Sequence, residues 1–192
     1  MAMTLSGPVT ATGVNIAGDV TASSMTVSSI TIANELNTSG AVLQIKGRVL
    51  QMQFSSTTVN TVVTATTWTA VSNLSHSITL KNANDYVRIS LTGNLSNEDA
   101  MGYKPAYITI YRDSINLGDS NSGLLAATWI SSLPAGLASY AVGITLTDSP
   151  QDTSSHTYQP YILATSGGSA IFPNNGSPTL VPAVLLLEEV AQ

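Results

Sequence analysis

The chain has 192 residues and a formal net charge of −5, and only 9% of its residues are charged. An average soluble domain is roughly 25% charged, so the 49 serine and threonine residues must supply most of the wetted surface. Nucleic-acid binding needs clustered lysine and arginine, and the six basic residues are scattered, so that function class is excluded.

The same composition excludes several other kinds of protein. There is no cysteine, which removes disulfides, thiolate nucleophiles and cysteine–zinc sites. No apolar run approaches the length of a membrane span, and the first ten residues lack the features of a secretory signal. We therefore expect no membrane insertion. A protein that works outside a cell without these features would be released by lysis, as virion components are.

Residues 1–44 differ from the rest of the chain and contain an approximate repeat. The segment GPVTATGVNI at 7–16 is echoed by GDVTASSMTV at 18–27, with a period of eleven residues. A chance likeness between two Ser/Thr-rich runs is the competing interpretation. No aromatic residue precedes Phe54, so a self-sufficient globule is not expected here. We predict an extended, repetitive β arm over 1–44 that attaches to a partner.

The predicted arm places apolar side chains at strand-like intervals. Asp19 and Glu35 are its only ionised side chains, so docking should be mainly apolar and weakly sensitive to salt. Strand addition to another protein would pair the free backbone groups and bury these side chains together. The residues expected to bind the partner are Val9, Val14, Ile16, Val20, Met25, Val27, Ile30 and Ile32.

Residues 45–192 predict a second domain made of short strands. Alternating apolar and polar residues or β-branched runs recur about every eight to twelve residues, and no window has a helical period. This spacing indicates an all-β, antiparallel jelly-roll-like sandwich. The clearest hairpin has strands at 106–111 and 115–117. The positions expected to be buried are Tyr107, Ile110, Tyr140, Val142, Ile144 and Leu186.

The stretch 136–163 predicts two strands joined by a polar turn. Residues 139–146 alternate with a period of two, which points one set of side chains into a core. The turn TDSP at 147–150 ends that strand, because proline has no N–H and Asp and Ser favour local turns. Pro160 within the second strand indicates an edge position or a bulge.

The apolar run VLLL at 184–187 predicts a strand that is covered on both faces. One face of a two-layer sandwich is normally wet, so a neighbouring subunit is the natural cover. If Val184 and Leu186 face the core, Leu185 and Leu187 form the interface of a homotrimer.

No motif has the spacing of an active site. Asp148, Ser149 and His156 have the residue types of a catalytic triad, but nothing fixes a nucleophile elbow or an oxyanion hole. Asp119 opens a segment that begins like a calcium loop, yet no Glu follows at the twelfth position. Trp129 fits packing under its own loop better than stacking on a sugar. We expect no catalytic, cofactor or metal site.

Several segments together resemble a known class of protein. They are RVLQ at 48–51, YVRI at 86–89, YITIYRD at 107–113, LGD at 117–119, LTDSP at 146–150 and SSHTY at 154–158. Their order resembles the C-terminal β domain of structural and tail-fibre proteins from tailed phages, notably those of cyanobacteria and marine bacteria. The likeness covers about 48–190, and residues 1–44 are similar to the repetitive linkers before such domains. It implies a virion protein and carries over no site.

Three functional hypotheses follow. The first is a non-enzymatic protein of the phage particle surface, a trimeric short tail-fibre-type protein docked by its arm to other virion proteins. The alternative is a capsid cement or decoration protein that stabilises the head, which the shortness of the chain favours. The third, a carbohydrate-active depolymerase, would need paired carboxylates facing a groove. Host-surface carbohydrate is a further candidate partner of a fibre.

Overall fold

The computed structural model describes residues 3–4, 20–21, 46–98, 104–127, 138–165, 167–174 and 181–192. The chain divides into two units, Met1–Leu43 and Gln44–Gln192. In the first unit, β1 (Met3–Thr4) pairs in parallel with β2 (Val20–Thr21). Val20 lies in β2, and the other seven predicted partner-binding residues of the arm lie outside the described residues. The attachment role of the arm therefore stays a prediction.

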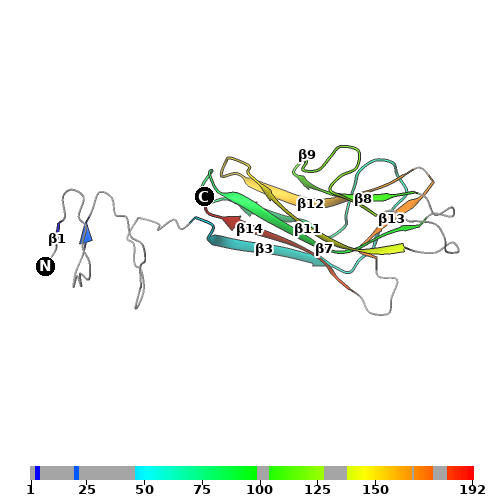
Figure 1. The fold of residues 1–192 in the computed structure, drawn as a ribbon, viewed down its shortest axis with the longest axis horizontal. Coiled ribbons are helices and arrows are strands. Elements are labelled where there is room, and N and C mark those ends of the chain that lie inside the picture. Colours follow the sequence, from blue (N-terminus) through cyan, green and yellow to red (C-terminus); the bar gives the residue numbers. More distant parts are fainter. Residues whose placement is uncertain are drawn as a thin grey trace. The chain divides into compact units, whose positions relative to one another are not determined.

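The second unit contains two antiparallel six-stranded sheets (Figure 1). The β7 sheet consists of β3 (Val49–Thr57), β4 (Thr61–Val63), β7 (Tyr86–Glu98), β11 (Ala138–Asp148), β13 (Ser169–Phe172) and β14 (Ala183–Val190). The β12 sheet consists of β5 (Thr69–Ala70), β6 (His76–Thr79), β8 (Ala106–Arg112), β9 (Ile115–Asn116), β10 (Leu125–Ala127) and β12 (Ser155–Ala164). The predicted all-β, antiparallel, jelly-roll-like sandwich is confirmed. None of the described residues forms a helix that could cross a membrane.

The two sheets enclose one apolar core. On β7 the side chains of Val87, Ile89 and Leu91 point inward and are fully buried, and Ile108 and Ile110 of β8 meet them from the other sheet. On β7 the alternation of apolar and polar residues, which the sequence shows, thus determines which side chains enter the core. Among the predicted core positions, Ile110, Val142 and Ile144 are buried, whereas Tyr107, Tyr140 and Leu186 are half-buried.

The prediction of which β14 side chains face inward is wrong. Leu185 and Leu187 are fully buried in the core of their own chain, so they are not available to a neighbouring subunit. They lie opposite Leu91 and Ile89 of β7. Because residues 184–187 are all apolar, their sequence cannot indicate which face is inside, and the strongly alternating β7 determines it instead.

Residues 138–164 form the two predicted strands, but these lie in different sheets. β11 pairs with β7, and β12 pairs with β8 on one side and with β6 and β5 on the other. Pro160 is therefore in a central strand, which differs from the predicted edge position or bulge. Its carbonyl accepts the N–H of Val71, so its ring nitrogen faces the interval between β5 and β6. No ladder hydrogen bond is needed there.

Candidate functional site

A cluster of charged side chains lies where the loop at 149–154, between β11 and β12, meets the turn between β8 and β9. Arg112 at the end of β8 forms an ion pair with Asp148 at the end of β11, with Nη1 2.9 and 2.8 Å from the two carboxylate oxygens. The hydroxyl of Tyr158 also donates to Asp148, at 2.7 Å. Burial and this contact raise the pKa of Tyr158, so its proton stays on the oxygen. The three side chains join the two sheets.

His156 forms the second half of the cluster. Its Nδ1 is 2.8 Å from Oδ2 of Asp113 in the β8–β9 turn, and its Nε2 is 3.0 Å from Oδ1 of Asp152 in the 149–154 loop. Only a doubly protonated ring can donate to both carboxylates. Burial disfavours the charged ring, but the hydrogen bonds to Asp113 and Asp152 outweigh it and raise the pKa of His156.

The structure does not assemble a catalytic triad from Asp148, Ser149 and His156. Both ring nitrogens of His156 are occupied by Asp113 and Asp152, so neither can take a proton from Ser149. Asp148 is bound to Arg112 and Tyr158 instead. A triad requires the base to contact its nucleophile and its orienting carboxylate, and this arrangement provides neither contact.

The calcium-like segment at 119–123 is a loop that closes on itself. Oδ1 of Asp119 accepts hydrogen bonds from the N–H groups of Asn121 and Ser122 and from the hydroxyl of Ser122. These bonds lower the pKa of Asp119 and hold its carboxylate within the loop. No cluster of three potential metal ligands occurs among the described residues. Trp129 lies outside the described residues.

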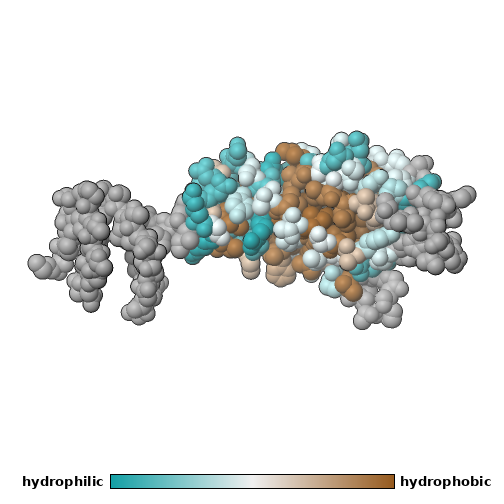
Figure 2. Space-filling view, in the orientation of Figure 1, coloured by the Kyte–Doolittle hydropathy of each residue, from teal (hydrophilic) through white to brown (hydrophobic). Residues whose placement is uncertain are grey.

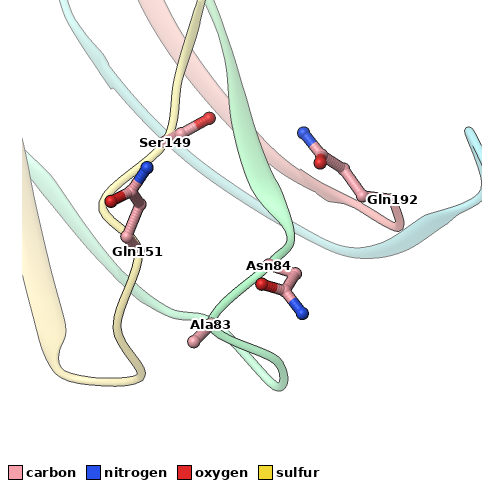
Figure 3. Close-up of a pocket in the computed structure, with 5 residues that line it drawn as sticks. All are labelled: Ala83, Asn84, Ser149, Gln151 and Gln192. Carbon is pink, nitrogen blue, oxygen red and sulfur yellow. The ribbon is translucent and has the colours of Figure 1, made fainter.

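The 149–154 loop also lines a polar pocket of about 480 Å³ (Figure 3). Ser149 and Gln151 on the 149–154 loop form one part of its wall, and the turn before β7 and the end of β14 supply the rest. Its lining residues are Ala83, Asn84, Ser149, Gln151 and Gln192. Among the described residues that line it, the Ser149 hydroxyl is the one nucleophilic side-chain group.

Apolar side chains reach the surface of the β domain in several places (Figure 2). On β3, Met52 and Phe54 are 60% and 68% exposed. Phe54 lies opposite Leu186 of β14. Val184 is two residues before Leu186 on β14 and therefore lies on the same outer face. We call these four residues, Met52, Phe54, Val184 and Leu186, the outer apolar patch. β3 is an edge strand that pairs with β14 alone among the described strands.

The apolar side of β3 faces outward, which was not predicted from the sequence. Its inward residues are polar. Gln51 donates 2.7 Å hydrogen bonds to Oε2 of the buried Glu189 and to the carbonyl of Thr79, and Gln53 is 3.1 Å from His76. These contacts close one side of the sandwich. The sequence alternates polar and apolar residues from Gln51 to Phe54, which is the available signal. The residues that bind the two glutamines are distant in sequence, so the inward face could not be assigned from it.

No protein-family model matches the chain, and no curated protein sequence matches it. Among solved structures, the chain is similar to the infectious bursal disease virus Gx strain structure, with 13% identity, a TM-score of 0.33 and coverage of 74% of this chain and 37% of that one. The Gt strain structure has 11% identity and a TM-score of 0.34, and the match covers 84% of this chain and 43% of that one. The VP2 subviral particle of the same virus has 12% identity and a TM-score of 0.30, and the match covers 75% of this chain and 38% of that one. The chain spans less than half the length of these proteins, and a likeness of this extent does not identify its function.

Proposed function

We propose that the chain is a non-enzymatic structural protein of a virus particle that assembles with copies of itself and with other virion proteins. The outer apolar patch carries this proposal, because soluble monomers seldom expose large apolar side chains together. The Ser/Thr-rich sandwich and the resemblance of residues 48–190 to phage structural proteins support it. The short tail-fibre role is the first candidate location, and capsid decoration is the second.

The outer apolar patch also replaces Leu185 and Leu187 as the proposed contact of a homotrimer. Its neighbours on the same face are mostly uncharged, such as Ser56 and Ser90. The adjoining Arg88 and Glu188 form an ion pair at 2.7 Å, so they cancel each other's charge. A face without net charge can meet another copy without the repulsion that a net charge of −5 would otherwise cause.

Replacing Phe54 with serine should reduce self-association while leaving the fold intact. Phe54 is largely exposed, so its removal costs the core little. Light scattering of the wild-type chain should give a mass about three times 19.9 kDa, and Phe54→Ser should shift that mass towards the monomer. Ile115→Ser is the matched control, because Ile115 is a similarly exposed residue of the other sheet. A wild-type monomer at micromolar concentration, or an equal effect of both variants, would contradict the proposed contact.

Incorporation into particles tests the proposed function and the arm separately. An epitope-tagged full-length chain, supplied to cells producing the virus, should be recovered in purified particles, whereas a chain lacking residues 1–44 should stay soluble and be left behind. Absence of the full-length chain from particles would refute the virion role. Equal incorporation of the truncated chain would refute only the attachment role of the arm. Labelling at the tail or over the head distinguishes the two locations.

A further inference from the structure

His156 links three segments of the β domain. The ring belongs to β12, Asp113 to the β8–β9 turn, and Asp152 to the 149–154 loop. The His156 side chain is 13% exposed, whereas the Asp113 and Asp152 side chains are 46% and 48% exposed. A largely covered ring is thus held between two carboxylates that solvent can reach. We propose that protonated His156 is a pH-sensitive clamp, which holds the 149–154 loop against the β8–β9 turn and releases it as the solution becomes alkaline.

The two contacts of the ring differ in how well their carboxylates are anchored. Asp113 accepts the N–H of Thr157 through Oδ1, in addition to its contact with Nδ1 of His156, so it is fixed to β12 twice. Asp152 is bound within its own loop, where its Oδ1 accepts the N–H of Ser154. A neutral imidazole has one N–H. The proton should stay on Nδ1, and the lone pair of Nε2 would then face the Asp152 carboxylate, which frees the loop.

Other charged groups near the ring do not compensate for this loss. Arg112 precedes Asp113, but its guanidinium is bound to Asp148. On β6, which pairs with this end of β12, His76 is the titratable residue, and its ring contacts Gln53. The remaining β6 residues, Ser77 to Thr79, carry no charge. The protonation of His156 therefore depends chiefly on Asp113 and Asp152.

The direction of the pH dependence follows from the shifts in pKa. The pKa of His156 is raised above its ordinary value of about 6.5, so the clamp is fully formed below that pH and is lost as pH rises through the raised value. Burial opposes ionisation of Asp113, but hydrogen bonds from His156 and Thr157 lower its pKa. Bonds from Ser154 and His156 lower the pKa of Asp152. The clamp is thus lost on the acid side only as pH falls below about 3.8.

Release of the loop would also change the polar pocket. Ser149 and Gln151 precede Asp152 on the same loop and line the pocket wall (Figure 3). The rest of the wall includes Ala83 and Asn84, whereas the ring nitrogens of His156 bind Asp113 and Asp152. Deprotonation would therefore move one wall and leave the other in place. This inference does not depend on the proposed virion role.

A titration of the full chain followed by NMR tests the clamp. In a His76→Gln background, the single remaining imidazole should have both ring nitrogens protonated at pH 6.5 and a midpoint above about 6.5. The amide signals of residues 151–154 should shift with the same midpoint, while those of β14 should not. A ring midpoint at or below about 6.5, or loop signals that do not follow the ring, would overturn the proposal.

Two carboxylate variants make the test specific. Asp152→Asn keeps the oxygen that accepts the Ser154 N–H but removes one of the two charges facing the ring, so the His156 midpoint should fall. Asp119→Asn is the matched control, since Asp119 is hydrogen-bonded within its own separate loop, and it should leave the midpoint unchanged. Equal midpoints in wild type and Asp152→Asn would show that Asp152 does not hold the protonated ring.

Discussion

Replacing Leu185 with alanine should lower the free energy of unfolding by about 2–5 kcal/mol, the range for a fully buried leucine. Leu185 has no exposed surface and lies between Leu91 of β7 and Ser55 of β3. Truncation removes its apolar contacts and leaves a cavity that two paired strands cannot close. Urea unfolding measures the loss, and thermal melting should show a Tm lower by about 2–4 °C for each kcal/mol.

Leu186→Ala is the matched control for Leu185→Ala. The two leucines are adjacent, but Leu186 points to the half-exposed outer face, so its truncation should cost clearly less. Measurement at low protein concentration separates this cost from any loss of self-association, because only association depends on concentration. If Leu186→Ala were the more damaging variant, the assigned direction of the β14 side chains would be incorrect.

Much of the fold was predictable because its signals are local. Proline and glycine positions, Asp/Ser turns and runs of β-branched residues place the strands close to their observed bounds. The hairpin of β8 and β9 follows directly from its short turn, where Tyr111 pairs with Asn116. The partner of a strand across a longer connection is not a local property. β11 and β12 are joined by a six-residue polar loop, at 149–154, yet belong to different sheets.

The inward faces of β3 and β14 show why alternation alone is insufficient. A period of two separates two sets of side chains but does not say which set is inside. On β7 the two sets differ so strongly in polarity that the choice is clear. On β14 both sets are apolar, and on β3 the polar set is inside because Gln51 finds Glu189 and Thr79 as partners. The inward faces of those two strands could not be predicted because they depend on residues that are distant in sequence.

The charged cluster was hidden in the sequence for the same reason. Asp113, Asp148 and Asp152 come from two connections more than thirty residues apart, and the turn and the loop bring them together only in the folded sandwich. The sequence displayed suitable residue types at Asp148 and His156 but not their partners. In the folded chain these few charged residues form ion pairs and hydrogen bonds that connect loops and strands of the two sheets.

The ion pair of Arg112 and Asp148 should therefore contribute strongly to stability. Replacing Arg112 with methionine keeps an aliphatic stem that can cover the same surface but removes the ion pair and leaves the Asp148 carboxylate bound to the Tyr158 hydroxyl. The two charged side chains are 15% and 12% exposed, and removing one partner of a buried pair costs roughly 3–5 kcal/mol. Because some water reaches both groups, we expect a loss of about 3 kcal/mol in urea unfolding, at the lower end of that range.

Two further variants determine whether that loss comes from the unpaired charge. Adding Asp148→Asn to Arg112→Met removes the uncompensated carboxylate while keeping an acceptor for Tyr158, so the double variant should recover part of the lost stability. Arg88→Met breaks the comparable pair with Glu188 on the outer face, where the Arg88 side chain is 42% exposed, and should cost clearly less because solvent screens such pairs. If Arg112→Met were no more damaging than Arg88→Met, the pair at Asp148 would be a surface ion pair in energetic terms. The link between the two sheets would then rest on apolar packing and on other polar contacts, such as that of Gln51 with Thr79.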